Sequence, residues 1–155
     1  KMRENKRSEF HKNNIGFVFQ SYHLIDELTV FENIETPLLY KKVKGSERKE
    51  MVDAMLEEFG MTEKKDLFPH QLSGGEQQRV GVARAVVIKP RVILADEPTG
   101  NLNSKQGEQV MNLFTQLHAG GTTIVQVTHS EQCASYSKRV VHLLDGEVVR
   151  DEPNV

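Results

Sequence analysis

Apolar residues along this chain follow two patterns, one typical of strands and one typical of helices. Short runs at residues 15–19, 92–95 and 123–128 are rich in apolar and β-branched residues and too short for helices, which predicts buried strands. In the segments between them, apolar residues recur every three or four positions, as on one face of a helix. This alternation predicts an α/β fold with a mainly parallel sheet.

Helix start signals stand at several points between these runs. Thr29-Val30-Phe31-Glu32 has the spacing of a capping box, in which a hydroxyl and a carboxylate satisfy the first amides of a helix. Ser46 and Ser104 are placed to cap two further helices. The first of these carries Met51 and Met55 on its apolar face, where we expect them to fill the core.

The predicted elements divide the chain into a core and an inserted helical block. We expect residues 1–25 and 88–155 to form the sheet core and residues 26–87 to form a helical subdomain inserted between strands. Residues 139–144 and 147–150, joined by a two-residue turn of Asp-Gly, predict a hairpin at the far edge of the sheet.

Ser73-Gly74-Gly75-Glu76-Gln77 predicts a helix start with chemistry of its own. Ser73 and Glu76 have capping-box spacing. Two glycines inside that first turn leave its amides without covering side chains, and bare amides at the positive end of a helix dipole favour an anion such as phosphate.

Polar residues follow each of the three predicted strands. Gln20 ends the first, Asp96 and Glu97 end the second, and His129 follows the third. The carboxyl ends of parallel strands gather at one edge of a sheet, where ligands bind. Adjacent carboxylates at a buried strand end need a positive partner, and Mg²⁺ accepts such oxygen ligands together with substrate phosphates.

Composition adds limits rather than a function. The net charge of −2 gives no global basic field, so nucleic acid is not an expected partner, and the basic stretches at Lys1–Lys12 and Lys41–Lys49 read as solvated faces. The first is expected to be the end of a helix or a connector. Cys133 is the single cysteine, which is compatible with a reducing compartment. The chain contains no apolar run long enough to cross a membrane.

Taken in order, these motifs resemble those of the ATP-binding cassette ATPases, a P-loop NTPase family. The stretch from Ser73 to Gln77 is similar to the signature motif, Gln20 to the Q-loop glutamine, residues 93–97 to the Walker B strand, residues 100–103 to the D-loop and His129 to the switch histidine. Residues 19–24 and 96–102 further resemble the branch that serves lipoprotein release and macrolide or peptide export.

The resemblance implies a mechanism and a set of partners. Two cassettes pair head to tail, as a homodimer or with a second ATPase domain, and bind ATP with Mg²⁺ between them. The expected catalytic residues are Glu97 and His129, and the expected metal ligands are Gln20 and Asp96. The residues expected to contact the nucleotide are Gln20, Ser73, Gly74, Gly75, Glu76, Gln77 and Asn101. An integral membrane permease is the expected partner, which would hold the cytoplasmic chain on the inner face of the membrane.

Two departures from the family pattern leave alternatives open. No G-x-x-x-x-G-K-[ST] phosphate loop occurs in the 155 residues. We expect an N-terminally truncated domain whose loop lies upstream of Lys1, with a naturally degenerate loop as the alternative, and expect the chain alone to be inactive. Asn103 stands where the D-loop usually has aspartate. A soluble ATPase acting on nucleic acid or ribosomes and a silent, signature-donating module are the competing functions.

Overall fold

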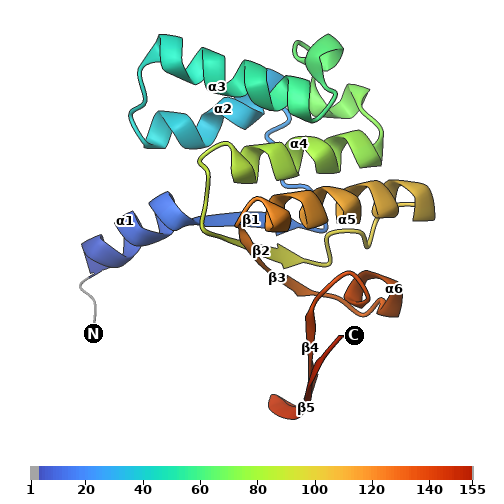
Figure 1. The fold of residues 1–155 in the computed structure, drawn as a ribbon. Helices are drawn as coiled ribbons and strands as arrows, with labels where there is room; N and C mark the ends of the chain where they lie inside the picture. Colours follow the sequence, from blue (N-terminus) through green and yellow to red (C-terminus); the bar gives the residue numbers. More distant parts are fainter. Residues whose placement is uncertain (1–3, 155) are drawn as a thin grey trace.

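The computed structural model describes residues 4–154 and shows an α/β arrangement (Figure 1). Lys1 and Arg3 of the basic opening stretch lie outside the described residues. The elements in chain order are α1 (Glu4–Asn14), β1 (Ile15–Phe19), α2 (Val30–Tyr40), α3 (Gly45–Glu58), η1 (Thr62–Lys64), η2 (Pro69–Gln71), α4 (Gly74–Val86), β2 (Val92–Asp96), α5 (Ser104–Ala119), β3 (Thr123–Val127), α6 (Glu131–Ala134), β4 (Arg139–Leu144) and β5 (Glu147–Pro153).

A three-stranded parallel sheet lies at the centre, with β2 between β1 and β3. Phe19, Asp96 and Val127 are register partners, so the three strands end side by side. This confirms the parallel sheet predicted from the three apolar runs. The shared end also brings the segments that follow each strand to one edge.

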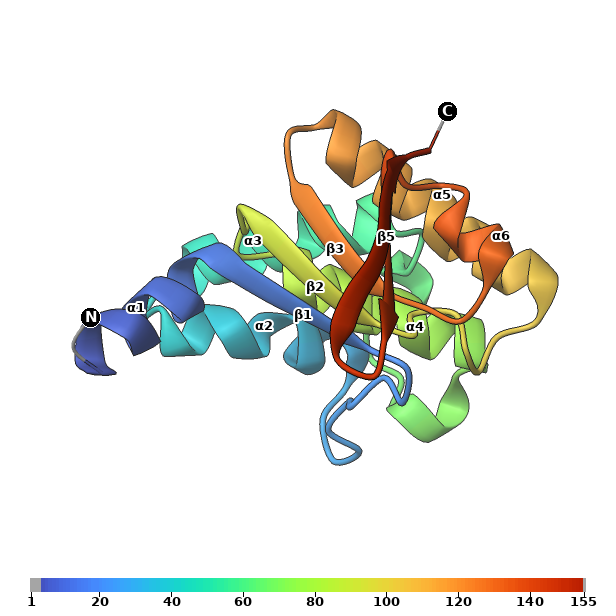
Figure 2. The ribbon, with the colours of Figure 1, turned by 90° about the horizontal axis from the view of Figure 1, so that it is seen from below.

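Helices α4 and α5 cover one face of the sheet, α4 against β1 and α5 against β3 (Figure 2). The residues that alternate inward are buried, including Val18, Ile93 and Ala95. Phe17 and Val125 point to the opposite face of the sheet, where both side chains are exposed. Strand alternation therefore places one set of side chains in the core and the other on the open face.

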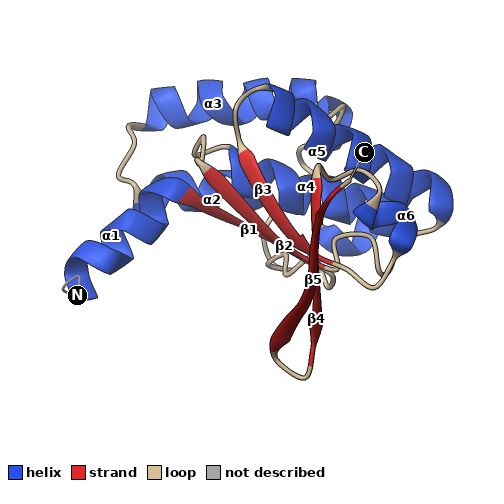
Figure 3. Cartoon of the chain, turned by 60° about the horizontal axis from the view of Figure 1, so that its bottom comes forward, coloured by secondary structure: helices blue, strands red, loops and turns tan. Residues whose placement is uncertain are grey.

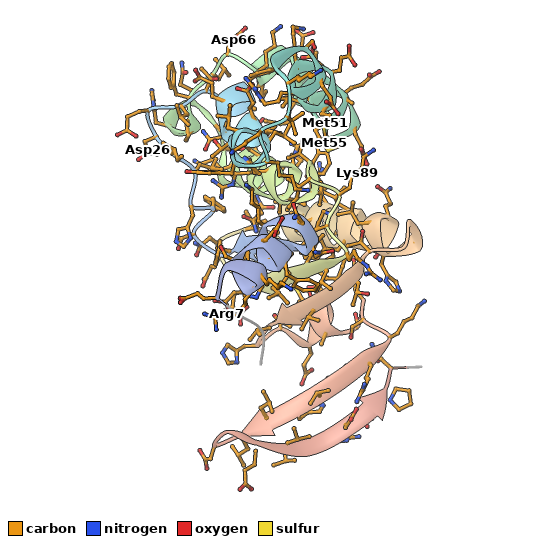
Figure 4. The ribbon with its side chains drawn as sticks, turned by 90° about the vertical axis from the view of Figure 1, so that its left-hand side faces the viewer. Arg7, Asp26, Met51, Met55, Asp66 and Lys89 are labelled. Atoms are coloured by element: carbon orange, nitrogen blue, oxygen red, sulfur yellow. The ribbon has the colours of Figure 1, made fainter. Side chains whose placement is uncertain are left out.

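The segment between β1 and β2 is helical, and α4 lies between the sheet and the α2–α3 pair (Figure 1). The Thr29–Glu32 capping box is present at the start of α2, as predicted. Met51 and Met55 of α3 are half-buried and pack against the core (Figure 4). The prediction that Ser46 caps α3 is wrong, because the helix begins at Gly45, with Lys44 at its cap position and no side-chain cap bond, so that Ser46 lies inside the helix.

The same correction applies to α5. Ser104 is its first helical residue, and the cap is Asn103, whose Oδ1 accepts the amide of Gln106 at 3.0 Å. The Gln106 Oε1 in turn accepts the Asn103 amide at 3.4 Å, which completes a capping box. Asn103, noted in the sequence as an unusual D-loop residue, therefore has a structural role at the helix start.

The predicted hairpin exists but does not extend the central sheet. Strands β4 and β5 form a separate two-stranded sheet that projects away from the sandwich of sheet and helices (Figure 3). Asp145 and Gly146 both have positive φ, 50° and 83°, as a tight hairpin turn requires. Among residues 4–154, none of the helices is long and apolar enough to cross a membrane.

Candidate functional site at the sheet edge and the start of α4

Gln20 and the segment after β2 are joined at the carboxyl edge of the sheet. Gln20 Nε2 donates to Asn101 Oδ1 at 3.2 Å, and Asn101 Nδ2 donates to the Gln20 carbonyl oxygen at 3.1 Å. A side chain on Gly100 would place its Cβ 2.5 Å from Gln20 Nε2, so a larger residue there would displace the Gln20 side chain from this position. The structure therefore brings together two residues predicted to contact nucleotide, Gln20 and Asn101.

Glu97 is held in a defined position immediately beyond β2. Its φ of 44° lies in the left-handed region, which a residue with a side chain adopts at a cost. The Glu97 amide donates to the Val127 carbonyl at 2.9 Å. Its carboxylate accepts the His129 amide at 2.8 Å and the Thr128 hydroxyl at 3.3 Å. The last residue of β3 thus fixes the backbone of Glu97, and the two residues after β3 fix its carboxylate.

His129 occupies the outer side of the same edge. Its side chain is 98% exposed, and its Nε2 lies 3.8 Å from Glu97 Oε1. The imidazole is therefore free to meet a group arriving from solvent next to the Glu97 carboxylate. The structure brings these two predicted catalytic residues together.

Oxygen ligands suitable for Mg²⁺ are present at this edge. The Asp96 side chain is exposed at the end of β2. The side-chain nitrogen of Gln20 bonds to Asn101, which leaves the side-chain oxygen of Gln20 to bind a cation. Within residues 4–154 there is no group of three or more His, Cys, Asp or Glu side chains that could hold a metal. The donor set fits a cation that takes one or two protein ligands and completes its shell with phosphate and water.

The start of α4 has the predicted capping box. Glu76 Oε2 accepts the Ser73 amide at 2.9 Å, and the Ser73 hydroxyl accepts the Glu76 amide at 3.4 Å. Lys64, at the end of η1, pairs with the other carboxylate oxygen of Glu76. The hydrogen bond from Lys64, followed by that from the Ser73 amide, lowers the pKa of Glu76 from its ordinary value. Gln77 is half-buried and donates from Nε2 to the Leu72 carbonyl at 3.2 Å.

The two glycines of this turn are packed against side chains from distant segments. A Cβ on Gly74 would lie 2.8 Å from the Tyr22 hydroxyl oxygen, and one on Gly75 would lie 2.8 Å from side-chain atoms of Gln106. Gly75 is buried and Gly74 half-buried. A larger residue at either position would have to displace one of these side chains, so packing also favours glycine here, a reason that sequence reasoning from phosphate binding alone does not supply.

Sequence reasoning missed several residues that build this region: Tyr22, Lys64, Arg84, Gln106 and Thr128. Gln106 carried a signal, because Asn103 and Gln106 have capping-box spacing, but Ser104 was assigned as the cap. Thr128 and Lys64 act through tertiary contacts, which no local sequence pattern predicts.

Comparison with known proteins agrees with this geometry. The ABC transporter family profile matches residues 1–100. An uncharacterized ABC transporter ATP-binding protein of Bacillus subtilis, YvrO, is 46% identical over 145 residues, which are 94% of this chain and 63% of the relative. The macrolide export ATP-binding/permease protein MacB of Chlorobium phaeobacteroides is also 46% identical, over 96% of this chain and 22% of its own length. The chain thus spans less than two thirds of the first of these relatives.

A solved structure shows the same fold. The ATP-binding cassette MJ0796, in a dimeric post-hydrolysis state bound to ADP and Pi, superposes with a TM-score of 0.86 at 39% sequence identity, covering 99% of this chain and 68% of that one. The family match covers most of the chain, and the fold extends over nearly all of it. The chain belongs to the ABC transporter family and has the α/β fold of its ATP-binding cassettes.

Proposed function

We propose that this chain is an ATP-binding and ATP-hydrolysing component of an ABC transporter that drives transport through a membrane permease. The observation that carries the proposal is the arrangement at the sheet edge, where a fixed carboxylate, an exposed histidine and magnesium-type oxygen ligands meet. MacB, a relative named for macrolide export, combines ATP-binding and permease parts in one protein. Export of a macrolide, peptide or lipoprotein is the substrate class that this likeness favours.

Each residue at the edge has a chemical task in this proposal. Glu97 orients and polarises the water that attacks the terminal phosphate, because its carboxylate is held by Thr128 and His129 and remains 21% exposed. His129 contacts the terminal phosphate from the solvent side. Asp96 and Gln20 would hold Mg²⁺, which when bound would neutralise charge on the phosphates. Phosphoryl transfer depends mainly on such positioning and charge stabilisation.

The turn at Ser73 serves a different nucleotide. In the proposed pair, the Ser73 hydroxyl and the amides of Gly74 and Gly75 face an ATP bound mainly by the partner, at the positive end of the α4 dipole. The partner is a second copy of the chain or another cassette, as in the dimeric MJ0796 structure. A phosphate loop has to be supplied by another segment or chain, since the 155 residues contain none.

The proposed location follows from the proposed partner. Docking on an integral permease would place the chain on the cytoplasmic, inner face of the membrane. We do not propose a nucleic-acid partner, because the net charge of −2 gives no basic field to attract one.

A completed cassette tests the proposal. This is the present chain preceded by the phosphate-loop segment of a related cassette. We expect it to release phosphate from ATP in the presence of Mg²⁺, and Glu97→Gln to reduce turnover by about a hundredfold or more, the range for loss of a general base.

Glu58→Gln provides a matched control, because Glu58 is an exposed carboxylate at the end of α3 and should leave turnover unchanged. Turnover that is insensitive to Glu97 in a folded completed cassette would contradict the proposed role. Magnesium-dependent stimulation by a co-reconstituted MacB-type permease part would support the transport assignment.

A further inference from the structure

Arg84 connects α4 to the loop that follows Gln20. Its Nη1 donates to the His23 carbonyl at 2.6 Å and its Nη2 to the Tyr22 carbonyl at 3.0 Å. A guanidinium presents its donors in a rigid fork, so it can hold two successive carbonyls in one arrangement. Arg84 is half-buried, and this burial lowers the pKa of its guanidinium.

The loop that Arg84 holds is not in a relaxed conformation. Tyr22 and His23 have φ values of 59° and 46°, two consecutive left-handed residues that are not glycine. Such residues persist only where surrounding contacts over-determine them. The paired bonds from Arg84 are contacts of that kind, because they reach the carbonyls of the two left-handed residues themselves.

The same loop touches α4 at two further points along its length. A Cβ on Gly81 would lie 3.5 Å from the Tyr22 carbonyl oxygen, and a Cβ on Gly74 would lie 2.8 Å from the Tyr22 hydroxyl. Positions 74, 81 and 84 share one face of α4, spread along its length. Tyr22 therefore spans α4 from its first turn, beside Ser73, to its last turn, at Arg84.

The second half of the loop has its own anchor. Asn33, fully buried in α2, accepts the Ile25 amide at 2.8 Å and donates to the Ile25 and Leu28 carbonyls at 3.1 and 3.0 Å. Arg84 thus holds the first half of the loop, and Asn33 holds the second half. The part next to Gln20 depends on Arg84.

We propose that Arg84 is a positioning residue that holds the loop after Gln20 against α4, so that Gln20 and the Ser73 turn move as one unit. The inference deepens the proposed function: a displacement of α4 when the Ser73 turn meets nucleotide would be carried to Gln20, at the metal-binding edge. Loss of Arg84 would free the loop while leaving α4 folded.

Hydrogen exchange in the 155-residue chain tests this directly, without nucleotide. The Tyr22 amide bonds to the Phe19 carbonyl and the His23 amide to the Ser21 carbonyl, so both report on the loop. We expect Arg84→Ala to speed exchange at these amides by about ten- to a hundredfold, the range for loss of hydrogen bonds to a charged group. The Ile25 amide, held by Asn33, should change by less than about twofold.

Two companion variants separate positioning from general stability. Arg79→Ala removes another arginine of α4, whose Nη1 donates to the Phe59 carbonyl at 3.5 Å, and should leave the loop amides unchanged. Arg84→Lys keeps the charge but not the fork, and should give an intermediate increase; it also provides a reading if the alanine variant does not fold.

Two results would overturn the proposal. One is unchanged exchange at Tyr22 and His23 in folded Arg84 variants. The other is an equal increase at these amides, at Ile25 and throughout α4, which would show that Arg84 only stabilises the fold. Neither result depends on ATP hydrolysis, so failure here leaves the Glu97 test of the proposed function intact.

Discussion

The turn at Ser73 and the edge at Glu97 each present a reactive group, but they are held in different ways. Ser73 and Glu76 satisfy each other within four consecutive residues. Glu97 depends on Val127, Thr128 and His129, which lie about thirty residues away at the end of β3 and just after it. The first region is specified by local sequence, whereas the second exists only after β2 and β3 have paired.

The difference has a functional consequence. A locally capped turn keeps its geometry while the helix that carries it moves, which suits a surface that meets a partner's nucleotide. A carboxylate fixed by a neighbouring strand stays in place relative to the sheet, which suits a group that must orient water on its own nucleotide. The two regions are thus built for opposite sides of a paired site.

Removing the Thr128 hydroxyl should disrupt the Glu97 region, which depends on contacts between residues distant in the sequence. Thr128 donates to Glu97 and accepts the Ser130 amide at 3.0 Å, so Thr128→Val loses both bonds at nearly constant volume. We expect turnover of the completed cassette to fall about ten- to a hundredfold, as for loss of one hydrogen bond to a charged group. Thr115→Val, which loses only a bond to the Met111 carbonyl within α5, is the matched control and should keep full turnover.

Gly75→Ala should show that the Ser73 turn also depends on packing against a distant segment. Its Cβ would meet Gln106 at 2.8 Å, so we expect the free energy of unfolding in urea to fall by about 1–3 kcal/mol, the usual cost of overpacking. Gln106→Ala alone loses the bond to the Asn103 amide, so it is the reference for the double variant, and in its background Gly75→Ala should cost less than in wild type. An equal cost of Gly75→Ala in the two backgrounds would mean that Gln106 is not the obstacle.

Removing the side-chain cap at Ser73 should have the next smaller effect on stability. Ser73→Ala should lower the free energy of unfolding by about 1 kcal/mol, because the Glu76 amide loses its acceptor. Ser46→Ala makes the matched comparison, since Ser46 lies inside α3 and caps nothing. Equal losses from the two substitutions would remove the argument for a capped turn at Ser73.

The smallest expected effect is the pH dependence of the Lys64–Glu76 pair. The pKa of Glu76 is lower in the folded chain than its ordinary value of 4.5, so the unfolded chain takes up the proton first. The stabilisation is therefore fully present above pH 4.5 and is lost as the pH falls through the lower folded pKa.

Glu76→Gln preserves capping-box chemistry and removes the charge. We expect it to cost a few tenths of a kcal/mol at neutral pH, about the size of a partly exposed ion pair, and the difference from wild type to shrink in acid. Urea unfolding at several pH values measures it. A difference that grows as the pH falls would contradict the assignment to the charged pair.

The extent to which the sequence predicted this molecule follows the same division. The three central strands, the boxes at Thr29 and Ser73 and the Asp145-Gly146 turn depend on residues close in the chain, and all are present. The caps at Ser46 and Ser104 were wrong by one or two positions, since several polar residues near a helix start compete to cap it.

Tertiary contacts explain the rest. The hairpin was placed on the sheet because local pattern fixes a strand's existence but not its partner. Arg84, Thr128 and Gln106 could not be found from spacing in one segment, because each acts on a segment brought near only by folding.

Mixing two differently marked completed cassettes tests most directly whether Ser73 and Glu97 serve different nucleotides. One pair carries Glu97→Gln and Ser73→Arg on the same subunit, and the other pair carries them on opposite subunits. If each site combines Glu97 of one subunit with Ser73 of the other, separated substitutions spare one site and retain roughly half the turnover, while substitutions on one subunit damage both sites. The reverse pattern, with activity surviving only when both substitutions share a subunit, would contradict the account.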